Sequence, residues 1–164
     1  MKKQGNLKQL PNRGNNKCFG CSPFNPSGLQ MKFFVNEDSV FSSITVPEHL
    51  CGWNKLVHGG VISTILDEIM SWSAIYLLKK ITVTKSMTID FIKPIFICRE
   101  LKAEGKVLEV GKKREAKMEG LIYNKNGELC AKSTGTVALL TPDIAKRLGI
   151  MDDDDLKGFE PFLS

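Results

Sequence analysis

The chain lacks the long uncharged segments that membrane and secreted proteins carry. None of its apolar runs extends, free of charge, over the roughly 18 residues that a membrane-spanning helix needs. The first residues, Met1–Gln4, are basic but lead into polar residues rather than into the apolar stretch of a signal peptide. We therefore expect a cytoplasmic protein with no membrane partner.

Cysteine and histidine are few and scattered. The five cysteines are odd in number and dispersed, which is typical of reduced thiols in a cytosol. Cys18 and Cys21 have the spacing of zinc and redox sites, but no second cysteine or histidine pair stands at ligand spacing, and structural zinc takes four ligands. We therefore predict buried thiols and no metal site.

The aromatic-plus-basic motifs of nucleic-acid-binding modules are also missing. The net charge is +5, and a basic surface can face nucleic acid, a membrane or a phosphorylated small molecule. Because the motifs are absent, we expect no nucleic-acid partner.

One apolar-rich stretch dominates the sequence, residues 57–78. It contains no proline and is long enough for a helix of about five turns. Its apolar residues fall on more than one side, so we predict a buried central helix. Several small or polar side chains fall in one stripe of this helix: Gly60, Ser63, Thr64, Asp67, Ser71 and Ala74. Burying a carboxylate within that stripe is unfavourable unless it has a charged or hydrogen-bonding partner or a role in catalysis.

The start of this helix has the parts for attack on a carbonyl group. Gly59 and Gly60 stand where unpaired backbone N–H groups and the positive end of the helix dipole meet a developing negative charge. Asp67, two turns along, is an acid that can activate water or attack directly. His58 is expected to orient the loop by hydrogen bonding. The alternative for Asp67 is a structural role, hydrogen-bonded to a serine or a partner subunit.

The remaining sequence predicts strands around the helix. Alternating residues at 29–36 and 39–46 predict a hairpin, and β-branched, alternating stretches at 81–92, 98–110, 114–123 and 128–140 predict four further strands. A sheet can bury its apolar face by curling around one apolar helix, so we predict one α+β domain without internal repeats. The predicted organisation is a flexible arm at 1–17, a domain at 18–142, and a short helix with a solvated acidic tail at 143–164.

Four pieces of sequence, in this order, carry a family resemblance. They are the turn-rich Cys18–Leu29 segment, His58-Gly59-Gly60 followed by Asp67, the Asp90–Pro94 strand end, and the Gly111-Lys112-Lys113 turn. Together they resemble the hotdog-fold acyl-CoA thioesterases of the phenylacetate-degradation and human thioesterase-superfamily type. The resemblance implies a hotdog fold, in which a curved antiparallel sheet wraps around one long central helix, and hydrolysis of an acyl-CoA thioester.

The resemblance also implies roles for single residues. Asp67 corresponds to the general base or nucleophile, and the N–H of Gly60, with His58 and Gly59 beside it, to the group that polarises the thioester carbonyl. Thr84 falls where relatives carry a residue that positions the attacking water. The active site is shared between subunits, so we expect a homodimer or homotetramer. No cofactor is expected beyond the coenzyme A of the substrate.

Further residues are expected to contact substrate. Relatives carry Asn six residues before the His, where this chain has Gly52, so Asn54 is the available replacement. Trp53, Trp72 and Phe91 are expected to form the floor of the acyl pocket. Glu68 is expected to contact substrate or to lie at an interface. The coenzyme A phosphates are expected to meet the cations Lys112, Lys113 and Arg114.

Two alternative functions stay open at this point. One is a non-catalytic module that binds acyl-CoA. The other is a hotdog hydratase or dehydratase, which the resemblance disfavours because those relatives use a histidine–acid pair and this chain has only His49 and His58.

Overall fold

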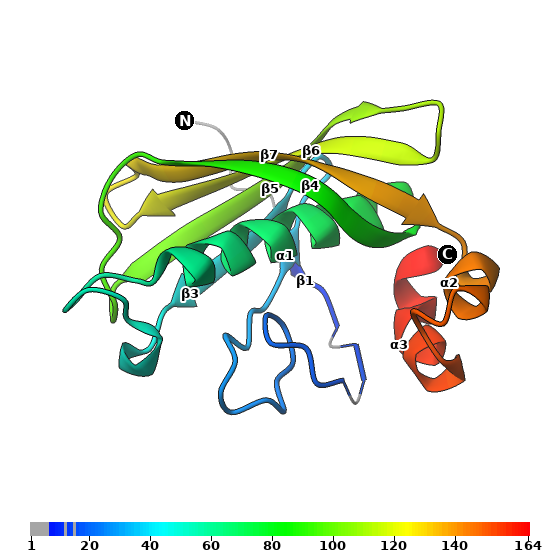
Figure 1. The fold of residues 1–164 in the computed structure, drawn as a ribbon, viewed down its shortest axis with the longest axis horizontal. Helices are drawn as coiled ribbons and strands as arrows, with labels where there is room; N and C mark the ends of the chain where they lie inside the picture. The colour runs from blue at the N-terminus through cyan, green and yellow to red at the C-terminus, as the bar shows by residue number, and fades with distance from the viewer. Residues whose placement is uncertain (1–6, 12, 15) are drawn as a thin grey trace.

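The computed structural model describes residues 7–11, 13–14 and 16–164 (Figure 1). In this part of the chain, one antiparallel sheet of seven strands curves over a long helix, α1 (Gly59–Leu78). The strand order is β1-β2-β3-β5-β6-β7-β4, which leaves β4 at one edge. The predicted hotdog fold is confirmed.

The other elements follow in chain order. The strands are β1 (Lys8–Gln9), β2 (Phe34–Val35), β3 (Val40–Thr45), β4 (Ile81–Phe91), β5 (Glu100–Val110), β6 (Glu115–Asn124) and β7 (Leu129–Leu140). The remaining helices are a 3-10 turn (Glu48–Leu50), α2 (Pro142–Arg147) and α3 (Asp153–Leu163). The predicted strand at 29–36 shrinks to β2, because Gln30 has a left-handed φ of 50° that interrupts the extended backbone.

The core lies between the concave face of the sheet and α1. Ile65, Leu66 and Ile69 are fully buried there. The helix comes so close to β5 that a Cβ added at Gly105 would lie 2.5 Å from the Ile69 carbonyl oxygen, so this position requires glycine. By length and composition α1 could cross a membrane, but 56% of its apolar window is buried inside this domain, as expected for the core helix of a sheet.

Part of the segment predicted as a flexible arm, 1–17, extends the sheet. Lys8–Gln9 pairs antiparallel with β2. The buried Leu10 donates its backbone N–H to the Phe33 oxygen at 2.9 Å. Residues 1–6, 12 and 15 of the predicted arm lie outside the described residues.

The acidic C-terminal run begins a helix rather than a solvated tail. Asp152 caps α3, and its side chain and that of Asp155 form a reciprocal capping box. Phe159 and Phe162 of α3 are buried against Trp72 of α1, with 5.0 Å between the ring centroids of Trp72 and Phe162. Trp72 therefore anchors the C-terminal helix, and the prediction that it lines a substrate pocket is wrong.

This aromatic cluster predicts a large stability effect. Replacing Phe162 by alanine should lower the free energy of unfolding by about 3–5 kcal/mol, because it leaves a cavity beside Trp72. Urea unfolding at fixed protein concentration measures the change. Phe24→Ala is the control, because Phe24 is 66% exposed and its loss should cost little. Equal stability of the two variants would contradict the packing of α3 on α1.

Candidate active site

Asp67 and Thr84 lie together where α1 meets the edge strand β4. The Thr84 hydroxyl donates a hydrogen bond of 2.6 Å to Asp67 Oδ1. The β4–β7 register shifts between Thr84 and Ser86, and such bulges often redirect side chains next to active sites. Asp67 Oδ2 has no hydrogen-bond partner within the described chain, so this oxygen can take a proton from water.

The helix start presents one free backbone donor. His58 is the N-cap of α1, and its Nδ1 accepts the Gly60 N–H at 2.9 Å. The predicted loop-orienting bond of His58 is therefore present, but it occupies the Gly60 N–H that was expected to hold the carbonyl oxygen. The Gly59 N–H has no partner among residues 7–11, 13–14 and 16–164. The geometry thus moves the available donor from Gly60 to Gly59.

An apolar groove of about 340 Å³ opens beside this donor. Its lining includes Gly59, Ile62 and Phe91, and an added Cβ at Gly59 would lie 3.7 Å from the Phe91 ring. Phe91 is 58% exposed in the single chain. The groove therefore offers an acyl group an apolar surface next to a backbone N–H.

Trp53 and Asn54 lie in the loop before the helix but outside the lining of this groove. Trp53 is 84% exposed. Asn54 has a left-handed φ of 47°, a conformation that asparagine tolerates better than most residues, so the turn itself accounts for this residue type. Neither side chain lines the groove, so in a single chain neither is placed to contact an acyl group bound there.

The Gly59 N–H and the Asp67 carboxylate, the two groups expected to act on the thioester, are separated along the helix. Asp67 follows Gly59 by eight positions in α1, which corresponds to about 12 Å at 1.5 Å per residue. A carbonyl held by the Gly59 N–H and a water activated by Asp67 must come within about 3 Å of each other to react. A single chain therefore does not assemble one complete site from these residues.

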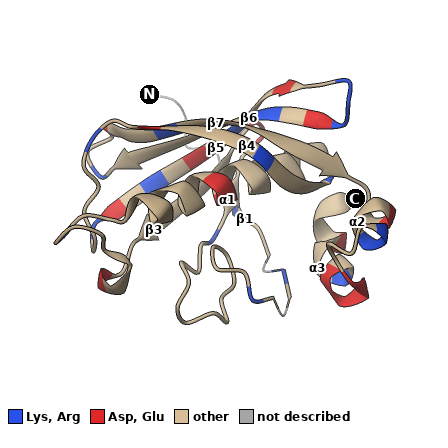
Figure 2. Ribbon diagram, viewed as in Figure 1, with Lys and Arg blue, Asp and Glu red and all other residues tan. Residues whose placement is uncertain are grey.

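The predicted phosphate-binding cations lie far from the helix start. Lys112, Lys113 and Arg114 form the exposed β5–β6 turn, and the Arg114 oxygen accepts the N–H of Leu139 at 2.8 Å. In the sheet, Leu139 pairs with Thr82, which follows shortly after α1 ends. The turn is thus at the opposite end of α1 from Gly59 (Figures 1 and 2).

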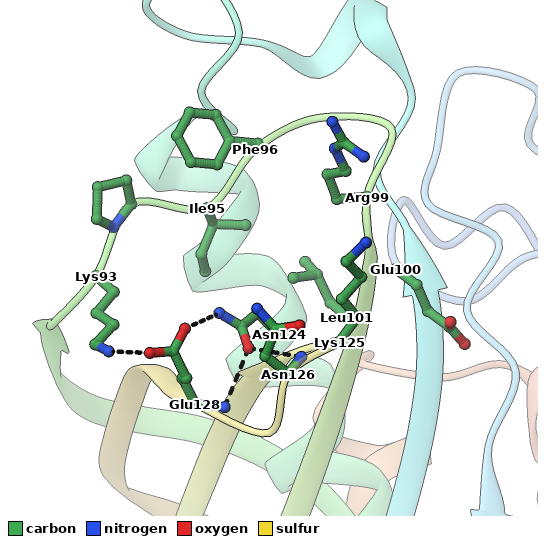
Figure 3. A pocket seen from close by; sticks show the side chains of 11 residues that line it. Lys93, Ile95, Phe96, Arg99, Glu100, Leu101, Asn124, Lys125, Asn126 and Glu128 are labelled. Carbon is green, nitrogen blue, oxygen red and sulfur yellow. Dashed lines mark hydrogen bonds and ion pairs between the residues drawn. The ribbon is translucent and has the colours of Figure 1, made fainter.

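Other cations lie at the helix-start end. Lys93, Arg99 and Lys125 line a second groove, of about 350 Å³ (Figure 3). Lys93 is paired with Glu128 at 2.6 Å, so part of this positive charge is neutralised. The sequence motif of the β5–β6 turn does not point to this groove, because Lys93 and Arg99 come from the β4–β5 loop and Lys125 comes from the β6–β7 turn.

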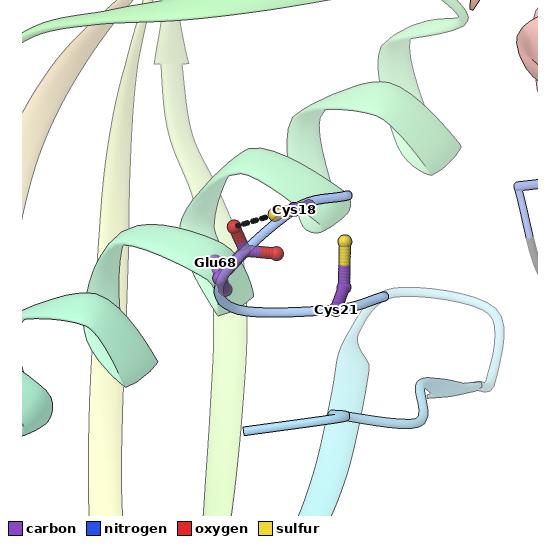
Figure 4. A group of neighbouring side chains, drawn as sticks. All are labelled: Cys18, Cys21 and Glu68. Atoms are coloured by element: carbon purple, nitrogen blue, oxygen red, sulfur yellow. Dashed lines mark hydrogen bonds between the residues drawn. The ribbon is translucent and has the colours of Figure 1, made fainter. Parts of the chain in front are cut away.

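The Glu68 side chain lies beside Cys18 and Cys21 (Figure 4). Its Oε1 and the Cys18 Sγ share a hydrogen bond of 3.3 Å. Burial, together with the neighbouring Cys18, raises the pKa of Glu68 to about 8. A hydrogen bond from the Cys21 thiol lowers the pKa of Cys18 to about 5, whereas the same bond and burial raise the pKa of Cys21. The structure therefore does not bring Glu68 to the predicted substrate contacts.

Comparisons with known proteins find one family-model match, over part of the chain, and several solved structures of similar fold. Residues 54–131 match the family model of the Thioesterase superfamily, and a search of curated proteins finds no match. A Streptococcus mutans protein solved with acetyl-CoA is 21% identical, with a TM-score of 0.61 over 66% of this chain and 87% of that one.

Two further solved structures are similar. The Escherichia coli PaaI protein from the phenylacetic acid degradation operon is 22% identical, with a TM-score of 0.63 over 69% of this chain and 81% of that one. Zebrafish thioesterase superfamily member 2 is 23% identical, with a TM-score of 0.62 over 72% of this chain and 88% of that one. These structures share the fold described above.

Proposed function

We propose that this chain is a hotdog-fold thioesterase that hydrolyses an acyl-CoA thioester to a free acid and coenzyme A. The observation that carries the proposal is the contact between Thr84 and Asp67 at the sheet edge. The family match and the similar fold of a structure with bound acetyl-CoA support the choice of substrate class.

The proposed reaction uses the groups described above. Asp67 Oδ2 takes a proton from water, and Thr84 holds Oδ1 so that the carboxylate faces the water. The water oxygen attacks the thioester carbon, and the Gly59 N–H with the helix dipole stabilises the oxyanion. Collapse of the tetrahedral intermediate breaks the C–S bond and releases the coenzyme A thiolate. Direct attack by Asp67 on the carbonyl is the alternative first step.

The proposal requires two copies of the chain. β4 is a sheet edge of 11 residues, and an open edge of this length can pair with a second chain. Antiparallel pairing of two β4 strands about a two-fold axis places the end of one strand against the beginning of the other. Phe91, near Gly59, ends β4, and Thr84, beside Asp67, lies near its beginning. The helix start of one subunit would then face Asp67 of the other.

Thiol release from a panel of short, medium, long and aromatic acyl-CoAs tests this function. We expect turnover of at least one member, and the best substrate reports the size of the apolar groove. Binding of acyl-CoA without thiol release would refute hydrolysis and indicate a binding module. Hydration of crotonyl-CoA in place of thiol release would instead indicate a hydratase.

A further inference from the structure

A compact group of ligand-type atoms lies outside the proposed catalytic residues. Cys18, Cys21 and Glu68 each offer one such atom, and these atoms all lie within 4.8 Å of one another (Figure 4). The two sulfurs come from a tight turn near the N-terminus, and the carboxylate comes from the middle of α1. The fold therefore brings together three possible metal ligands from two distant parts of the sequence.

Nothing else in this part of the structure balances the carboxylate. Among the described residues, no lysine, arginine or histidine forms an ion pair with Glu68. The turn closes directly over it, because a Cβ added at Gly20 would lie 2.3 Å from Glu68 Cγ. A carboxylate withdrawn from water requires a compensating charge or hydrogen bonds, and a bound cation would provide the charge.

We propose that Cys18, Cys21 and Glu68 bind a zinc ion, with a water molecule as the fourth ligand. Zinc–sulfur bonds of about 2.3 Å and zinc–oxygen bonds of about 2.0–2.2 Å in a tetrahedron place ligand atoms roughly 3.4–3.8 Å apart. The observed group fits within this range after small side-chain adjustments. Two thiolates favour zinc over magnesium or calcium, which prefer oxygen ligands only.

The surroundings of the cysteine turn support this assignment. The Cys18 N–H donates to Asn16 Oδ1 at 3.1 Å, and the Ser22 hydroxyl donates to the Asn16 oxygen at 2.5 Å. Asn16 and Ser22 are both buried. Polar groups that fix the backbone around ligands are typical outer-shell partners of metal sites.

The site would fasten a segment that has little structure of its own. Residues 16–33 form no helix or strand, and they lie on the side of α1 that faces away from the sheet (Figure 1). A metal joined to both Cys18 and Glu68 would tie this segment to the centre of α1, one residue from Asp67. We infer that the ion would hold this segment against α1 and take no part in thioester hydrolysis, although its water-filled fourth position differs from the four protein ligands of most structural zinc sites.

Metal titration of the full chain tests the proposal. The protein is kept reduced with a non-thiol reductant, freed of metal with a chelator, and titrated with Co²⁺ and then Zn²⁺. We expect about one ion per chain, thiolate-to-cobalt charge-transfer absorption with a tetrahedral d–d spectrum, and displacement of cobalt by zinc. The Tm should rise with zinc concentration.

Matched variants identify the ligands. Cys18→Ser and Glu68→Gln should each weaken zinc binding by more than the roughly 10–100-fold that loss of an outer-shell partner causes. Cys51→Ser, which alters an exposed cysteine away from the group, should bind as the wild type does. Absence of the charge-transfer band in the reduced wild-type protein, or unchanged affinity in Glu68→Gln, would overturn the proposal.

Discussion

Replacing Asp67 by asparagine is expected to lower kcat for thioester hydrolysis by about 10²–10⁴-fold, the usual contribution of a general base. Asparagine keeps the size of the side chain and an oxygen that can accept the Thr84 hydroxyl, but it cannot take a proton from water. The loss should therefore fall on kcat rather than on folding or substrate binding. Thiol release measures the rate, and circular dichroism checks that the fold is retained.

Two neighbouring variants serve as controls. Thr84→Ser keeps the hydroxyl that donates to Asp67 and should retain most of the activity, whereas Thr84→Val should lose part of it. Ser63→Ala alters the same stripe of α1, but among the described residues the Ser63 hydroxyl bonds only to the Gly59 oxygen, so a small effect is expected. Wild-type rates in Asp67→Asn would show that another group performs the chemistry.

The sequence predicted the long regular elements well because their signals are local. The apolar stretch at 57–78 becomes α1 at Gly59–Leu78, and β4 to β7 begin and end within about two residues of their predicted bounds. The pairing of Asp67 with Thr84 could be anticipated because the family resemblance placed both residues at one site.

What the sequence did not predict depends on contacts between distant segments. The acidic run at 152–155 looked like a solvated tail, although the capping box and the spacing of Phe159 and Phe162 were available as signals. Their partner, Trp72, is far away in sequence. Glu68 likewise meets Cys18 across 50 residues. Such pairings appear only once the chain has folded.

The second large effect is expected at the helix start. Gly59→Pro removes the one free backbone N–H there and should lower kcat by about 10²–10³-fold, as loss of an oxyanion donor does. The fold should tolerate the change, because proline suits the first position of a helix. His58 already has the extended backbone (φ −60°, ψ 137°) that precedes proline. Thiol release with a folding check measures the effect.

Gly59→Ala is the matched control, because it keeps the N–H and its Cβ makes only an ordinary contact, 3.7 Å, with Phe91. If Gly59→Ala loses as much activity as Gly59→Pro, the groove rather than the N–H is responsible. If Gly59→Pro is fully active, the Gly60 N–H, released from His58 Nδ1, becomes the donor to test.

Mixing the two inactive variants then tests whether the site is shared. Co-refolded Asp67→Asn and Gly59→Pro chains form mixed dimers in which one site combines an intact Asp67 with an intact Gly59 from the other chain. With random pairing, about half of the dimers are mixed, and one of the two sites in each mixed dimer is intact. About one quarter of all active sites are then intact, so activity should recover to about one quarter of wild type. A site built within one chain would contain one defect in every copy and recover nothing. The roughly 12 Å that separates Gly59 from Asp67 along α1 therefore predicts recovery.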